Sequence, residues 1–268
     1  MDFLRIFFLL LFFLNFSCSE YQKILNSDNI NMKYKAAEKY YDLGEFRRAN
    51  RLFEQLVPSF RGKPQAERLD FFFADSYYQI KNYYLAAYQF ENFIKSFPKS
   101  QKVELASFLV AKSHYLMSPK YSLDQEETNS AIEKLQIFIN NYPESEYMNE
   151  CNQLVNELQN KIEKKQFEIA KQYYVIYDYR AAINALDNFI SEFVGTKYRE
   201  EALYYKFLSS YEIAINSVES KKMERLKDLK QLYINIIQYY PETLFLADLS
   251  KKIKIVDEEI NTFEELKI

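Results

Sequence analysis

The chain has 268 residues, a formal net charge of −3, 24 Tyr, 23 Phe and no Trp. Because a weakly acidic chain has no general electrostatic attraction for nucleic acid, we expect no nucleic-acid partner. The sequence has three glycines, and runs that alternate apolar and polar residues are scarce, so we predict an all-α fold.

The N-terminal segment has the features of a secretion signal. Residues 1–17 hold one cation, Arg5, in an otherwise apolar run from Phe3 to Leu14. That length suits the apolar region of a signal peptide, ~7–15 residues, and is short for a membrane span of ~20. We therefore expect residues 1–17 to be a cleaved signal peptide, although a retained hydrophobic anchor is an alternative.

Cys18 directly follows this segment and the small residue Ser17. The arrangement resembles the lipobox of bacterial lipoproteins, although Asn15 stands where leucine is usual. The resemblance implies a covalent lipid such as palmitate on Cys18, with no other cofactor, and a lipidated tether over residues 18–29. Ser19-Glu20 lacks the aspartate that retains lipoproteins at the inner membrane, which implies the outer membrane. A secreted protein with an incidental cysteine is the alternative.

From residue 30 onward an aromatic-to-small spacing recurs. A gap of nine residues separates three Tyr–Ala pairs, namely Tyr40–Ala49, Tyr78–Ala87 and Tyr173–Ala182. Alanine lets two helices approach closely, and apolar residues four and seven positions later continue the same helical stripe. Proline or glycine then ends the second helix. Each copy therefore predicts a helical hairpin.

Two further copies carry an insertion in the turn. Their gaps are sixteen residues, Tyr115–Ala131, and eighteen residues, Tyr211–Leu229. The second insertion, 217–230, has mixed charge, which is typical of a solvated helix face, with a partner-facing patch as the alternative. The long run 144–177 has no Pro or Gly, and we expect an extra helix there, followed after a break or bend near Lys164-Lys165 by the next hairpin.

This pattern resembles the tetratricopeptide repeat, whose ideal period is ~34 residues. Because one hairpin cannot bury its apolar face, the copies are expected to stack into a right-handed solenoid of about five hairpins with a C-terminal capping helix. An irregular helical bundle is the alternative. The expected repeat domain is 30–268, with repeats at about 30–64, 68–100, 103–147, 148–195 and 197–241 and a cap at 243–268.

The sequence offers little catalytic chemistry. His114 is the one histidine of the chain and cannot by itself supply the three or four protein ligands of a zinc site. Neither a nucleophile elbow nor a phosphate-binding loop motif occurs. We expect no enzyme, no metal site, and a buried apolar role for Cys151.

The expected function is therefore a binding scaffold. Helix positions in the first two repeats predict a groove that is aromatic and polar and suits an extended peptide with apolar side chains. Its predicted residues are Tyr34, Glu38, Tyr41, Phe72, Ser76 and Gln79. Some tetratricopeptide proteins bind a terminal carboxylate through a Lys and Asn clamp; Glu38 and Ser76 occupy its Asn positions, so that chemistry is not carried over.

Together, the lipobox cysteine, the tether and the five hairpins resemble the BamD family of outer-membrane lipoproteins. The most specific segment is 111–147, with Asp124-Gln125, Thr128, Tyr142-Pro143 and Ser145-Glu146-Tyr147. The resemblance implies a lipid-anchored scaffold at the periplasmic face of the bacterial outer membrane, within the β-barrel assembly machinery.

In that family the C-terminal repeats dock on the periplasmic domains of the BamA-type barrel insertase. The N-terminal repeats are proposed to recognise a C-terminal signal on unfolded outer-membrane protein precursors. Other subunits of the machinery are further expected partners. The alternatives are another periplasmic tetratricopeptide adaptor, in an envelope or cell-division complex, and a glycan-binding lipoprotein, which is usually longer and rich in Trp.

Overall fold

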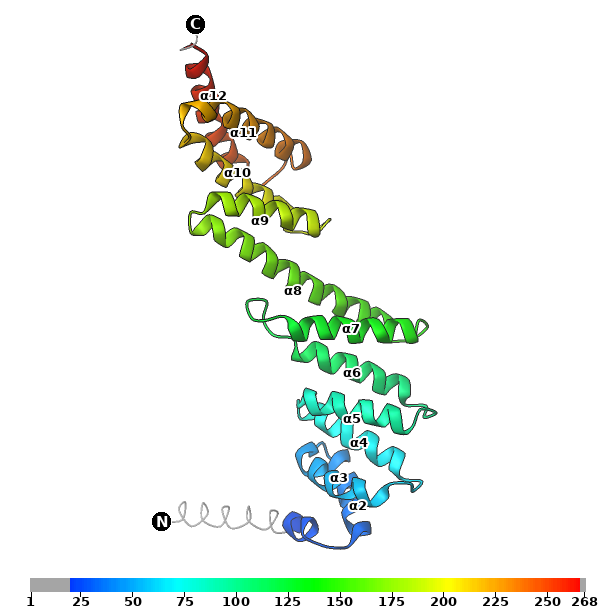
Figure 1. The fold of residues 1–268 in the computed structure, drawn as a ribbon. Helices are drawn as coiled ribbons and strands as arrows, with labels where there is room; N and C mark the ends of the chain where they lie inside the picture. The colour runs from blue at the N-terminus through cyan, green and yellow to red at the C-terminus, as the bar shows by residue number, and fades with distance from the viewer. Residues whose placement is uncertain (1–19, 266–268) are drawn as a thin grey trace, which may run out of the picture. The chain divides into compact units, whose positions relative to one another are not determined.

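The computed structural model describes residues 20–265. Helices make up most of this range, and it contains no strand. The predicted all-α fold of consecutive hairpins is confirmed (Figure 1). The helix pairs are α2 (Ile30–Asp42) with α3 (Phe46–Phe60), α4 (Ala66–Gln79) with α5 (Tyr83–Ser96), α6 (Val103–Met117) with α7 (Glu126–Asn141), α8 (Met148–Val175) with α9 (Tyr179–Glu192), and α10 (Arg199–Ile215) with α11 (Glu219–Tyr239), followed by α12 (Leu246–Glu265).

The first helix of each pair is called the A helix below, and the second the B helix. The alanines that the spacing placed on four B helices are buried, as the close helix contact requires: Ala49, Ala87, Ala131 and Ala182. The last pair has the larger Leu229 at this position, and it is buried too. The burial of the four alanines explains why alanine recurs there, because a larger side chain would hold the two helices apart.

The described chain divides into two compact units. Unit 1 comprises the described residues up to Pro119 together with Leu123–Leu158, and unit 2 comprises Lys120–Ser122 together with the described residues from Gln159 onward. The core of unit 1 is rich in phenylalanine, with Phe53, Phe90, Phe93 and Phe138 almost fully buried. The core of unit 2 is built on Phe167 and Phe207 with aliphatic residues of α11 and α12.

Of the break or bend predicted near Lys164-Lys165, the break is wrong, because α8 is one continuous helix of 28 residues. Its buried residues instead serve two cores. Leu158 packs in a cluster of unit 1, and Phe167 packs in a cluster of unit 2. The spacing of the apolar residues along α8 changes between Leu158 and Phe167 because they belong to different cores, and the backbone is helical throughout.

Part of the segment expected to be a tether is also folded. Residues 20–25 are helical, and Tyr21, Ile24 and Leu25 pack against the core of the first hairpin. Tyr21 contacts the ring of Tyr40 edge to face at 5.4 Å, and its hydroxyl donates to the Arg48 carbonyl at 3.3 Å. The stretch available as a tether is therefore shorter than 18–29.

A recurring joint links each of three B helices to the helix that follows it, which is an A helix in two cases and α12 in the third. In unit 2, Thr196 Oγ1 accepts from the backbone N–H of Tyr198, and Thr243 Oγ1 accepts from that of Phe245. The aromatic ring that follows then stacks on the preceding A helix: Tyr198 on Phe167 at 5.4 Å, and Phe245 on Tyr204 at 4.0 Å. The corresponding stack in unit 1 is Tyr147 on Phe108, at 4.2 Å.

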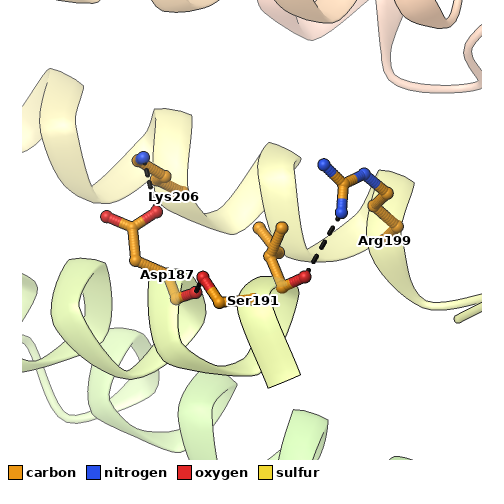
Figure 2. A network of polar contacts seen from close by, with 5 residues as sticks. Asp187, Ser191, Arg199 and Lys206 are labelled. Atoms are coloured by element: carbon orange, nitrogen blue, oxygen red, sulfur yellow. Dashed lines mark hydrogen bonds and ion pairs between the residues drawn. The ribbon is translucent and has the colours of Figure 1, made fainter. Parts of the chain in front are cut away.

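Polar contacts add to the apolar packing between α9 and α10. Lys206 Nζ lies 2.5 Å from Asp187 Oδ1, and Arg199 Nη1 donates to the Ile190 carbonyl at 3.3 Å (Figure 2). Ser191 Oγ donates to the Asp187 carbonyl at 2.9 Å within α9. Together the two inter-helix contacts fix the register of a B helix on the A helix that follows it.

Candidate functional site

The predicted groove residues lie on two successive A helices of unit 1, and we call this surface the α2–α4 face. It carries Tyr34, Glu38 and Tyr41 from α2 and Phe72 and Gln79 from α4. Tyr41 and Phe72 are stacked, with centroids 4.4 Å apart and an interplanar angle of 17°. Tyr34 stacks on Phe60 of α3 at 5.2 Å. These rings are half-buried, so they support the fold as well as the surface.

Beneath the aromatic pair lies a buried carboxylate, Asp75, which is 7% exposed. The hydroxyl of Tyr41 donates to Asp75 Oδ2, and Gln79 Nε2 lies 3.3 Å from Oδ1. Burial first, and then this hydrogen bond, raise the pKa of Tyr41 far above its usual range, so the phenol remains a donor at neutral pH. Because a buried carboxylate needs such donors, the pair holds Tyr41 in place.

An ion pair borders the same face. Arg68 Nη2 lies 3.1 Å from Glu38 Oε1, and the Arg68 guanidinium sits 5.1 Å from the centre of the Phe72 ring. Glu38 Oε1 is buried and receives no aligned hydrogen bond within residues 20–265. The Glu38 carboxylate is therefore held mainly by the charge of Arg68 at this edge of the α2–α4 face.

Ser76 does not belong to this surface, so its predicted place in the groove is wrong. It is fully buried, its Oγ donates to the Phe73 carbonyl at 2.7 Å, and it accepts from Asn50 Nδ2 at 2.9 Å. Since both hydrogen-bonding roles of the hydroxyl are used inside the hairpin, Ser76 has a structural role between α3 and α4.

A pocket of about 480 Å³ opens beside Gln79, at the hairpin-turn end of the first two hairpins. Its charged lining consists of Arg47, Arg48, Lys81 and Glu45, and Arg48 is paired with Glu45 at 2.5 Å. Because Glu45 is paired with Arg48, the remaining charge of the pocket lining comes from Arg47 and Lys81 and is positive. The α2–α4 face thus runs from an aromatic pair, through the exposed amide of Gln79, to a basic pocket.

The sequence analysis missed a recurring tie between successive A helices. A tyrosine of one A helix donates to a carboxylate of the next A helix in two places, Tyr41 to Asp75 and Tyr115 to Glu157. Tyr204 of α10 donates in the same way to Asp248 of α12. Burial first, and then the hydrogen bond to Asp248, raise the pKa of Tyr204. The signal in the sequence is a Tyr and an acidic residue 34 to 44 positions apart, which is close to one repeat.

The remaining predicted residues add no chemistry to the α2–α4 face. His114 is half-buried on α6, its Nδ1 lies 3.4 Å from Ser130 Oγ, and burial lowers its pKa. No group of three His, Cys, Asp or Glu that could hold a metal occurs in the part of the chain that the structure describes. Cys18 and the signal segment lie outside the described residues. Between residues 20 and 265, none of the helices has the length and apolar character that a membrane span requires.

The comparison with known families agrees with the helical architecture. The model of the YfiO family, described as outer membrane lipoprotein, matches residues 27–216 and again residues 160–268. No curated protein matches the chain. The two matched ranges include every hairpin described above and overlap over 160–216, as two alignments of a repeated architecture can. The chain therefore belongs to the YfiO family of outer membrane lipoproteins, which is the BamD family that its sequence resembles.

Proposed function

We propose that this chain is a scaffold subunit of the machinery that assembles β-barrel proteins in the bacterial outer membrane. In this proposal a lipid on Cys18 anchors it at the periplasmic face, and it has no catalytic role. The chain docks on the periplasmic domains of the BamA-type barrel insertase, beside other subunits, and helps to recruit unfolded barrel precursors. The observation that carries the proposal is the family match over residues 27–268.

The α2–α4 face supports the recruiting role. A precursor segment in extended conformation presents alternate side chains to one side, and apolar ones can cover the stacked rings of Tyr41 and Phe72. The exposed amide of Gln79 offers a polar partner for the main chain of such a segment. Ser76 takes no part, because it is buried.

The partner experiment comes first. We would solubilise native membranes, purify the protein through a C-terminal tag and identify what accompanies it by mass spectrometry. A BamA-type barrel protein in stoichiometric amount is the expected result. If division or peptidoglycan-associated proteins are recovered without it, the chain is a different periplasmic adaptor and the proposal fails.

The recruiting role needs a separate measurement. A fluorescent peptide with the sequence of a precursor C-terminal strand is titrated with the protein. Replacing Tyr34 or Phe72 with alanine is expected to weaken binding, and replacing the exposed Tyr88 of α5 is the control. Circular dichroism melts identify variants that remain folded. Unchanged affinity in folded variants of both residues would refute this surface as the binding site.

A further inference from the structure

The turn between α8 and α9 holds a tyrosine in a strained backbone conformation. Tyr177 has φ +66°, in the left-handed region. For a residue with a bulky side chain this conformation is a genuine outlier, and it destabilises the folded chain relative to the right-handed region. Such outliers persist where the surrounding structure fixes them, and they gather at functional sites.

Comparison within the chain shows that the turn itself requires this backbone. In three hairpins the A helix closes with the same hydrogen bonds, for example Tyr177 N–H to the Tyr174 carbonyl at 3.0 Å and Asp178 N–H to the Tyr173 carbonyl at 2.9 Å. The residue in the left-handed position is Gly44 in the first hairpin, Lys81 in the second and Tyr177 in the fourth. Glycine adopts this conformation freely, so the ring of Tyr177 is not needed to form the turn.

The Tyr177 side chain contributes little to the fold. It is 78% exposed, and its one ring contact in the described chain is the edge of Tyr179, at 6.3 Å between centroids. The two preceding residues, Val175 and Ile176, are also exposed. Tyr173 is partly exposed too, whereas its counterpart in the first hairpin, Tyr40, is covered by Tyr21. We call residues 173–177 the Tyr177 knob.

Acidic groups lie beside the knob. Glu212 lies on α10, which packs against α9, and after burial its carboxylate is the largest cause that raises the pKa of both Tyr174 and Tyr179. Glu212 forms no ion pair within residues 20–265. Asp178 accepts from the Ala181 N–H as the cap of α9. The nearest cations along the chain are Lys171, which is paired with Glu201, and Arg180. An apolar projection with these acidic neighbours is complementary to an apolar socket with lysine or arginine at its edge.

We propose that the Tyr177 knob inserts into a folded partner protein whose surface offers an apolar socket bordered by basic side chains. Tyrosine suits this role, because it is large, loses little conformational entropy and accepts a cation on its face. Unit 2 already uses such contacts internally, with Lys252 Nζ 4.5 Å from the centre of the Tyr211 ring. The inference rests on the proposed function, in which the partner is the periplasmic part of the barrel insertase.

The test distinguishes the effect of the left-handed backbone at Tyr177 from the effect of a contact between its ring and the partner. Full-length lipidated protein in detergent is titrated against the purified periplasmic domains of the insertase by biolayer interferometry. Tyr177→Gly removes the ring and the left-handed strain together, so its melting midpoint should be unchanged or higher by up to about 4 °C. Its affinity should fall about tenfold or more, as for an anchoring aromatic at an interface. Tyr177→Phe, which keeps the ring, should bind within a few-fold of wild type.

Lys81→Gly is the matched control, because it relieves the same backbone conformation in the second hairpin. It should show the same small thermal shift. The control for affinity is Tyr84→Ala, because Tyr84 is 72% exposed and lies outside both the α2–α4 face and the Tyr177 knob; this variant should bind like wild type. If Tyr177→Gly binds within twofold of wild type, the knob is not the docking point, although the proposed function stands. If wild type does not bind, both proposals fail. Two further results would also overturn the inference. One is a lower melting midpoint for both Tyr177→Gly and Tyr177→Asn, because the ring would then stabilise the fold. The other is a change in self-association, measured by sedimentation, without a change in affinity for the insertase domains.

Discussion

The Tyr41–Asp75 hydrogen bond is the most informative single contact to remove. Tyr41→Phe deletes the hydroxyl and keeps the ring that stacks on Phe72 at 4.4 Å. Asp75 is 7% exposed, so water cannot readily replace the lost donor, and the Gln79 amide at 3.3 Å is a weak substitute. A hydrogen bond to a charged group contributes about 1.5–3 kcal/mol, so we expect a loss of about 2 kcal/mol and a fall in melting midpoint of about 4–8 °C.

Thermal and urea melts followed by circular dichroism measure this loss, with Tyr88→Phe as the control. Tyr88 is 55% exposed, and its hydroxyl makes no hydrogen bond within the described residues, so its variant should match wild type. A double-mutant cycle with Asp75→Asn isolates the pair, and the coupling energy should exceed about 1 kcal/mol. If Tyr41→Phe costs less than about 0.5 kcal/mol and the cycle is additive, the hydrogen bond does not stabilise the hairpins as argued.

Three further predictions concern other parts of the chain. Cys151 is 0% exposed and burial raises the pKa of its thiol to about 11, so maleimide at pH 8 should label it only after unfolding; rapid labelling of the native protein would contradict its burial. The hydrogen bond to Glu157, and then burial, raise the pKa of Tyr115 to about 12 from about 10 when unfolded. Folding therefore favours the protonated form of Tyr115. In urea melts, the stability that wild type gains over Tyr115→Phe should be complete below pH 10 and should shrink as the pH rises through 12. A gain that does not change with pH would exclude the linkage. Replacing Cys18 with alanine should move the protein from the membrane fraction to the soluble periplasmic fraction and abolish labelling by radioactive palmitate, and a variant still labelled would show that another residue carries the lipid.

The arrangement of consecutive hairpins could be predicted because it depends on local spacing. A Tyr and an Ala nine residues apart bring two helices together across one turn, and Ala49 and Ala182 are indeed buried at those contacts. This spacing needs no knowledge of distant residues. The family could likewise be recognised, because the inserted third hairpin lies within one continuous segment, 111–147.

The binding surface was harder to predict, because helical spacing predicts the side of a helix on which a residue lies but not how deeply its side chain is buried. Ser76 falls on the predicted side of α4, yet Asn50, 26 residues earlier, approaches it and places it in the core. Asp75 stands next to Ser76, and its importance depends on Tyr41, which is 34 residues away. Such pairings join different repeats, so only the folded chain reveals them.

The continuous α8 has a consequence for how the protein is degraded. Compact units are usually joined by an exposed linker, which proteases cut first. Here the boundary near Leu158 lies inside a helix, so the accessible sites are instead the hairpin turns, and a cut there disrupts the core of one unit. Limited proteolysis should therefore release no stable fragment that ends at the boundary between the two units, at residues 159–161. We therefore expect a cleaved copy to be degraded completely, so that no half-molecule remains bound to a partner protein.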